Sequence, residues 1–226
     1  MQSIATEKIG ECWLKSIQCV LNNGTDHYDE DVSMKELRGL CLKIENPSPH
    51  DSIINSAGDR RVIDNMQRKF SKGVTMPDRP FTYGQLIYDN DGVDQFEWLV
   101  RRLRQKSETK SATISLLTAG SESANLPCLN VLDAKLRSGA LELHFFFRSL
   151  NVFGRQYANL IALAEFQRKL IARLGCRRGP MKGYIASAHI YEYDFSAALD
   201  LVNGKTHQIV DQYYKSGPAS IRSESQ

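Results

Sequence analysis

The sequence lacks any long hydrophobic run and any closely spaced pair of cysteines. No stretch approaches the roughly 18 apolar residues that span a bilayer, and the N-terminus has no basic region followed by an apolar run. The five cysteines are odd in number, so they cannot all form disulfides, and none has metal-ligand spacing. We therefore expect a soluble cytoplasmic protein with reduced thiols, no bound metal and no membrane contact.

A strong charge imbalance is also missing, because the formal net charge is only +3. Adjacent arginines such as Arg177-Arg178 most often belong to solvated faces, so we expect no nucleic acid partner. The hydrophobic content of 42% and charged content of 24% are typical of globular proteins. A length of 226 residues predicts a single domain over residues 1–226, with a flexible polar tail at 216–226.

Hydrophobic spacing predicts few regular elements in the N-terminal part. Apolar residues within 4–21 recur at helical spacing, which predicts one helix. The polar residues 22–36 are interpreted as a loop, and residues 40–44 alternate like a strand. Residues 47–82 combine a helix near 60–71 with a loop that contains Gly and Pro.

From residue 93 onward the pattern is sharper. Leu141, Leu143, Phe145 and Phe147 alternate with their neighbours as in a strand, which ends at Arg148. The predicted order is a helix at 93–103, strands at 111–117, 128–136 and 141–147, a helix at 158–174, a strand at 182–191 and a helix at 197–210. This irregular succession predicts an α+β fold, in which helices flank a mixed β-sheet.

The clustered strands of residues 111–147 also bear on assembly. Their outer face would need a cover, and few predicted helices lie nearby in the sequence. Packing of one sheet against the sheet of a second copy would provide that cover. We therefore expect a sheet-to-sheet homodimer.

One cysteine stands in a chemically suggestive context. Cys128 follows Pro127 at the start of a predicted strand, and Arg148 ends the next strand. A lone cysteine in an apolar strand is usually a small core residue. A nearby guanidinium, however, favours the thiolate, which is the nucleophilic form. With Asn159 at the start of the following helix, three polar groups occupy element ends, where sheets commonly present ligand-binding groups.

Taken together, these residues resemble the thymidylate synthase family. The resemblance is carried by Pro127-Cys128, Arg148-Ser149, Asn159 and His189-Ile190-Tyr191, at spacings that match without a gap. The upstream segments Phe81-Thr82-Tyr83-Gly84 and Asp94-Gln95 match as well. The similarity extends from about Tyr83 to Phe195, and the chain looks like the shorter members of the family.

The resemblance implies a role for each matching position. Cys128 would add to C6 of a pyrimidine ring, and Arg148 would bind the 5'-phosphate and stabilise the thiolate. Asn159, whose amide carries both a donor and an acceptor, would read O4 and N3 of uracil. The remaining implied substrate-binding residues are Ser149 at the phosphate, His189 and Tyr191 at the sugar 3'-hydroxyl, Asn151 at the position of a family aspartate, and Tyr83 in the upstream motif.

The family also implies two partners besides the pyrimidine nucleoside monophosphate. The first is 5,10-methylenetetrahydrofolate, which supplies the one-carbon unit; no residue of this chain is assigned to it. The second is another copy of the chain, because the family completes its phosphate site with a cross-subunit arginine pair. Here Lys110 followed by Ser111 stands at that position, and lysine lacks the bidentate fork of arginine.

Several other positions depart from the family. No glutamate lies between Glu45 and Glu97, where the family places its water-organising glutamate, and Asp59 and Asp64 remain equal candidates to replace it. Leu129 stands where a histidine is common. Trp13 and Trp98 do not match the indole that stacks on the folate, and residues 222–226 lack the family's apolar end.

Three functions follow from this pattern. The leading expectation is thymidylate synthase-type methylation of dUMP to dTMP. A pyrimidine nucleotide 5-hydroxymethylase acting on dUMP, CMP or dCMP is the alternative, and Asn159 favours uracil, because aspartate is typical of enzymes that act on deoxycytidylate. The third is a nucleotide-binding relative without turnover.

Overall fold

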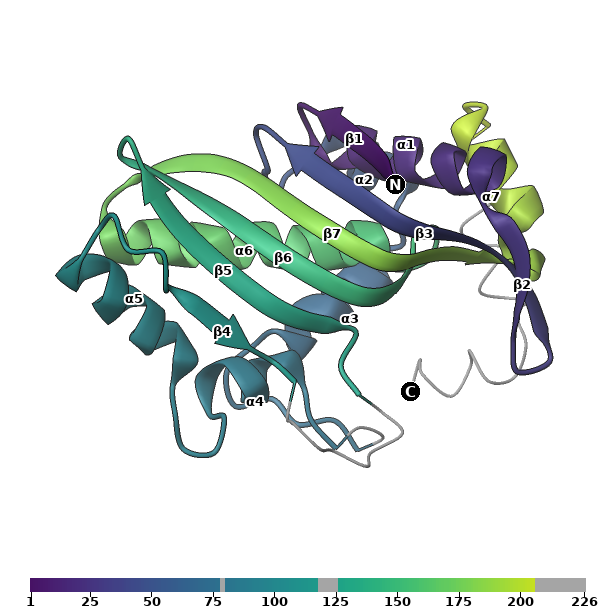
Figure 1. Cartoon of the computed structure of the whole chain (residues 1–226). Helices are drawn as coiled ribbons and strands as arrows, with labels where there is room; N and C mark the ends of the chain where they lie inside the picture. Colours follow the sequence, from purple (N-terminus) through teal and green to yellow (C-terminus); the bar gives the residue numbers. More distant parts are fainter. Residues whose placement is uncertain (78–79, 118–125, 206–226) are drawn as a thin grey trace.

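A mixed β-sheet runs through the chain and packs against helices (Figure 1). The computed structural model describes residues 1–77, 80–117 and 126–205. The strand order is β1-β3-β7-β6-β5-β4, and β2 pairs with β3 outside this path. In these ranges no helix has both the length and the apolar character required to cross a membrane.

The elements alternate irregularly along the chain, as the sequence predicted. They are β1 (Gln2–Thr6), α1 (Ile9–Asn23), β2 (Thr25–Asp29), β3 (Val32–Ile44), α2 (Ser52–Ala57), α3 (Arg60–Lys69), α4 (Tyr83–Tyr88), α5 (Gln95–Gln105), β4 (Thr113–Ser115), β5 (Leu129–Arg137), β6 (Ala140–Asn151), α6 (Gln156–Leu174), β7 (Arg177–Tyr191) and α7 (Phe195–Val202), with a 3-10 turn at Glu192–Asp194.

Two connections define the centre of the sheet. β5 and β6 form an antiparallel hairpin, whose turn residues Ser138 and Gly139 both have positive φ, at 49° and 74°. Such angles match the twist of two-residue hairpins. β6 and β7 are parallel because the 19-residue α6 carries the chain back between them. As a result, the C-terminal ends of β6 and β7 lie side by side.

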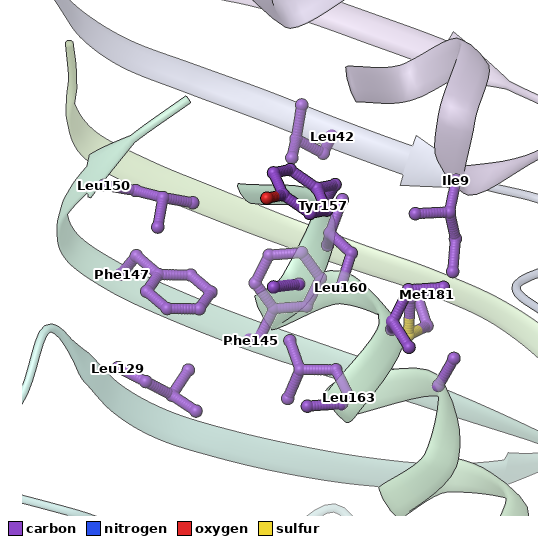
Figure 2. Packing of buried hydrophobic residues seen from close by; sticks show 14 of the residues in the cluster. Ile9, Leu42, Leu129, Phe145, Phe147, Leu150, Tyr157, Leu160, Leu163 and Met181 are labelled. Carbon is purple, nitrogen blue, oxygen red and sulfur yellow. The ribbon is translucent and has the colours of Figure 1, made fainter. Parts of the chain in front are cut away.

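The core lies between the sheet and α6. Leu141, Leu143, Phe145 and Phe147 on β6 are buried, and every second residue faces the same way. Figure 2 shows Phe145 and Phe147 beside Leu160 of α6. Burial of such side chains contributes about 1.5–3 kcal/mol each, so this layer fixes the strand ends that carry the candidate site.

The opposite face of the sheet is less covered. On β6, Glu142, His144 and Phe146 alternate with the core residues and are half-buried. Phe146 stacks on Tyr184 of β7 with ring centroids 5.7 Å apart. No described helix crosses the near face of β5, β6 and β7 in Figure 1. An aromatic pair on a bare sheet face is a surface that a second copy of the chain could cover.

The α+β architecture with a mixed sheet flanked by helices is confirmed. The elements predicted between residues 93 and 191 are all present with shifted ends. The last helix ends at Val202 as α7, earlier than predicted. The rest of that prediction beyond residue 205, and the tail at 216–226, fall outside the described residues.

Two predictions for the N-terminal part are wrong. The predicted helix at 4–21 is interrupted, because Ile4 belongs to β1 and pairs in parallel with Leu42 of β3, so α1 begins only at Ile9. The predicted loop at 22–36 contains β2 and the beginning of β3. Every residue of β2 is exposed, so the strand has no buried face to produce an alternating pattern.

Candidate active site

Cys128 and Arg148 meet at one end of the sheet. Cys128 immediately precedes β5, and its backbone carbonyl accepts a hydrogen bond of 2.9 Å from the backbone N–H of Arg148 on β6. This bond continues the antiparallel pairing of β5 and β6 one residue beyond Leu129 and Phe147, so Cys128 and Arg148 lie opposite one another. The cysteine is half-buried and the arginine is exposed, so a thiol and a guanidinium belong to paired residues at this end of the sheet.

Hydrogen bonds hold the segment that leads into Cys128. The Arg148 guanidinium donates to the carbonyls of Leu126, at 2.8 Å, and Pro127, at 3.2 Å. Asn130 donates from Nδ2 to the same Pro127 carbonyl at 2.8 Å. A guanidinium has five N–H donors in a planar fork, so two bonds to carbonyls leave it the capacity to bind an anion. Arg148 thus holds the backbone of Leu126 and Pro127, which leads into Cys128, and carries a positive charge on the residue opposite the cysteine.

Tyr83 lies under this segment. It is the first residue of α4, and its hydroxyl oxygen accepts from the backbone N–H of Leu129 at 3.4 Å. Its ring packs on Phe70 with centroids 4.8 Å apart. The structure therefore places Tyr83 next to the residue that follows Cys128, where it supports the strand start. Contact with substrate stays a prediction.

The ends of β6 and β7 bring three further predicted residues together. Ser149 pairs with Ser187, and Asn151 with His189, in the parallel register. The Ser149 hydroxyl lies 3.5 Å from Nδ1 of His189. Asn151 accepts from the backbone N–H of Gly154 at 2.8 Å, which closes the turn into α6. This bond gives Asn151 a local structural role, and its contact with substrate stays a prediction.

His189 and Tyr191 form an edge-to-face pair at the end of β7, with ring centroids 5.1 Å apart. His189 is 8% exposed. Burial lowers the pKa of His189, although a hydrogen bond to the Ser187 backbone and the charges of Asp29 and Glu36 act in the opposite direction. The imidazole is therefore held towards its neutral form.

Tyr191 carries a hydrogen bond to a distant part of the chain. Its hydroxyl donates to Oδ2 of Asp29, the last residue of β2, at 2.7 Å. Burial first, and then this bond to Asp29, raise the pKa of Tyr191 well above its ordinary value, so the phenol stays protonated. Sequence reasoning missed Asp29, because it lies in a polar segment interpreted as a loop.

Asn159 lies in the first turn of α6 and is 3% exposed. Its Nδ2 donates to the carbonyl of Arg155 at 2.9 Å. Its Oδ1 is buried and has no hydrogen-bond partner among the described residues, a property shared with side-chain oxygens of Gln156 and Gln167. A buried oxygen without a donor costs about 1–3 kcal/mol, which a ligand N–H could remove. Asn159 is thus prepared to accept a hydrogen bond.

Lys110 lies away from this cluster within one chain. Its backbone carbonyl accepts from Nζ of Lys135, near the far end of β5. Cys128 precedes Lys135 by seven positions, which corresponds to about 23 Å of extended strand. Lys110 therefore does not join the site of its own chain.

The two aspartates considered for the missing glutamate differ in position. Asp59 is buried and caps α3 by accepting from the backbone N–H of Arg61 at 2.7 Å. Its own backbone N–H donates to the hydroxyl oxygen of Tyr157 at 3.3 Å. Asp64 is half exposed and pairs with Arg60 at 3.0 Å. Tyr157 lies two residues before Asn159, so of the two aspartates Asp59 is the one tied to the first turn of α6.

Comparison of the sequence with known proteins identifies the family to which the chain belongs. Residues 55–213 match the family model described as thymidylate synthase, which covers more than half of the chain. The chain belongs to the thymidylate synthase family. The matched range contains the strand ends and the start of α6 that carry the predicted residues.

The similar proteins are archaeal and are provisionally named thymidylate synthases. One from Methanosarcina acetivorans is 27% identical over 205 residues, which span 89% of this chain and 94% of that protein. One from Methanothermobacter marburgensis is 27% identical over 216 residues, or 88% of this chain and 97% of that protein. The match therefore extends over nearly the full length of both relatives.

The described contacts account for a nucleotide better than for a cofactor. A cation, hydroxyls, a buried amide and an aromatic pair suit the phosphate, sugar and base of a nucleotide. Among the residues that the structure describes, no three His, Cys, Asp or Glu side chains gather as a metal site.

Proposed function

We propose that the protein transfers a one-carbon unit to C5 of a pyrimidine nucleoside monophosphate, with conversion of dUMP to dTMP as the leading reaction. The observation that carries the proposal is the position of Cys128 opposite Arg148 at the strand ends. Cys128, as its thiolate, attacks C6 of the ring, with the guanidinium-bearing residue Arg148 opposite it. Family membership supports the reaction class.

The residues around Cys128 have separate roles in the proposed reaction. Addition of sulfur to C6 makes C5 a nucleophilic carbon, which forms a bond to the one-carbon unit as that unit's bonds to the folate nitrogens break. The C5 proton leaves, a hydride from the folate completes the methyl group and leaves dihydrofolate, and elimination of the Cys128 thiolate restores the ring. Arg148 and Ser149 hold the phosphate, and His189 and Tyr191 contact the sugar. Asn159 accepts from N3–H through its unpaired Oδ1. The one-carbon unit comes from 5,10-methylenetetrahydrofolate.

The test combines two readouts on the intact protein. With 5-fluoro-dUMP and methylenetetrahydrofolate, an adduct should appear on the Cys128 peptide in mass spectrometry. With dUMP labelled at C5, the label should be released to water. A protein that binds dUMP but releases no label would be a nucleotide-binding relative, and the proposal of catalysis would be wrong.

Hydroxymethylation is the second candidate. It is favoured by departures from the family on the folate side, because neither Trp13 nor Trp98 stands where the family stacks an indole on the folate. Absorbance separates the two reactions, since only methylation produces dihydrofolate. A rise near the dihydrofolate maximum supports dTMP formation, and label release without that rise supports the hydroxymethylated product.

Arg148→Ala is expected to weaken nucleotide binding about tenfold to a hundredfold, because a charge-assisted pair is worth about 1.5–3 kcal/mol. Calorimetry with dUMP and with deoxyuridine measures the effect. Affinity for deoxyuridine should barely change, because it has no phosphate. The control Arg60→Ala removes an exposed arginine that pairs with Asp64 on α3. Equal losses for nucleotide and nucleoside would contradict the phosphate role.

We also propose a homodimer that packs the open faces of β5, β6 and β7 together. Lys110 would then serve the phosphate site of the partner, because it cannot reach the site of its own chain. Sedimentation at micromolar concentration should give a dimer, and Phe146→Glu should give monomers, since it places charge on the aromatic pair. An active wild-type monomer would contradict the arrangement.

Mixing two variants tests the shared site directly. Cys128→Ala has no nucleophile, and Lys110→Ala weakens the phosphate site of its partner. Co-refolded together, they should form heterodimers with one intact site, which recovers roughly a quarter of the wild-type sites for random pairing. No recovery above the Lys110→Ala homodimer would show that Lys110 acts within its own chain or not at all.

A further inference from the structure

The β2–β3 hairpin reaches the end of β7. Its turn has only two residues, Glu30 and Asp31, so Asp29 at the end of β2 pairs with Val32 at the start of β3. Two residues further along, Met34 pairs with Tyr191 of β7. Figure 1 shows the hairpin extending beyond the body of the sheet beside the end of β7. The hairpin thus carries a carboxylate to the pair formed by His189 and Tyr191.

The hydrogen bond between Tyr191 and Asp29 determines whether the phenol can donate or accept a hydrogen bond with a ligand. A phenol has one proton and two lone-pair positions, whereas a carboxylate only accepts. Because the proton of Tyr191 points to Oδ2 of Asp29 at 2.7 Å, the phenolic oxygen has only lone pairs to offer elsewhere. Burial and this bond both raise the pKa of Tyr191, so the proton stays in place at neutral pH.

We infer that Asp29 is a positioning residue that sets Tyr191 as a hydrogen-bond acceptor in the sugar site, an inference that rests on the proposed nucleotide-binding function. A sugar must then offer a hydroxyl proton to Tyr191. Sugars in which that hydroxyl is replaced by fluorine or hydrogen have no proton to donate. Asp29 therefore selects nucleotides with a hydroxyl donor next to Tyr191, without touching the nucleotide itself.

The experiment compares pairs of nucleotides in calorimetry. The parent is whichever of dUMP, UMP, dCMP and CMP the wild type binds most tightly, and its partner carries fluorine in place of the 3'-hydroxyl. Wild type should prefer the hydroxyl by about threefold to tenfold, the range of one neutral hydrogen bond. Asp29→Ala should reduce this preference to less than about twofold, because the released phenol can donate to fluorine. Asp29→Asn, which keeps an acceptor oxygen, should retain it.

Two controls separate positioning from hairpin stability. Asp26→Ala removes another β2 carboxylate, which pairs with Lys35, and should leave the preference unchanged. Tyr191→Phe should abolish the preference, and adding Asp29→Ala to it should change nothing more. A further loss of affinity in the double variant, equal to that in Asp29→Ala alone, would mean that Asp29 acts only through the hairpin fold, and the inference would be wrong.

The inference and the proposed function can fail separately. If wild type binds none of the four nucleotides, both the proposed function and the inference about Asp29 are wrong. If wild type and Asp29→Ala prefer the hydroxyl over fluorine equally, the inference about Asp29 is wrong, and the proposed nucleotide-binding function is unaffected.

Discussion

Cys128→Ala should abolish release of the C5 proton, with a fall on the order of 10³-fold or more, as expected when a covalent nucleophile is lost. Without sulfur at C6, C5 remains part of a conjugated ring and has no nucleophilic character. The measurement is label release from C5-labelled dUMP under saturating nucleotide. Cys128 is the free cysteine whose backbone carbonyl accepts from Arg148.

The fold should survive this change, which makes the result interpretable. Cys128 is half-buried and lies just before β5, so its truncation to alanine removes one sulfur atom at the edge of the core. Circular dichroism and the urea midpoint should match wild type closely. Cys41→Ala is the matched control, because Cys41 is also a half-buried free thiol at the sheet. Loss of activity in Cys41→Ala, or a 5-fluoro-dUMP adduct on another cysteine, would contradict the assignment.

Asn159→Asp should move base preference from uracil towards cytosine. Uracil offers an N–H at N3 and an acceptor at O4, whereas cytosine has an acceptor at N3 and an amine at C4. The amide of Asn159 satisfies uracil, and a carboxylate would accept from the cytosine amine. Each mispaired buried group costs about 1–3 kcal/mol, so two mismatches should change the ratio of rates by roughly 10²-fold or more.

The measurement is the ratio of proton-release rates for dUMP and dCMP in wild type and variant. Asn151→Asp is the control: it introduces the same charge at the end of β6, where the Gly154 N–H can still donate to a carboxylate. The control should keep the preference for uracil. A wild type that already prefers cytidine nucleotides would favour the hydroxymethylase and would assign base reading to a group other than Asn159.

The site was predictable where function and a buried pattern coincide. Arg148 follows four alternately buried residues, so that part of the strand and the polar residue after it are visible in the sequence, although β6 itself continues to Asn151. Asn159 lies in the first turn of α6, a long helix with a mostly buried first half. The order of the strands, by contrast, depends on pairings such as Ile4 with Leu42, which local spacing does not encode.

The hairpin was not predictable for a physical reason. β2 buries none of its residues, so it produces no periodic signal. The bond from Asp29 to Tyr191 joins positions 162 residues apart, and no spacing rule connects them. The short helix α4 was missed too, although Thr82 and Gln85 form a capping box at its start, because it has only six residues. Isolated short elements depend on tertiary packing rather than on local preference.

The hydrogen bonds of Arg148 to the carbonyls of Leu126 and Pro127 make the two central residues of the site interdependent. The side chain proposed to hold the phosphate also anchors the backbone that presents the thiol. A lysine would keep the charge but not the planar fork that reaches two carbonyls at once. A substitution at position 148 therefore cannot change phosphate affinity alone, because it also removes hydrogen bonds that hold the backbone before Cys128. A change in substrate range would have to arise from substitutions elsewhere in the chain.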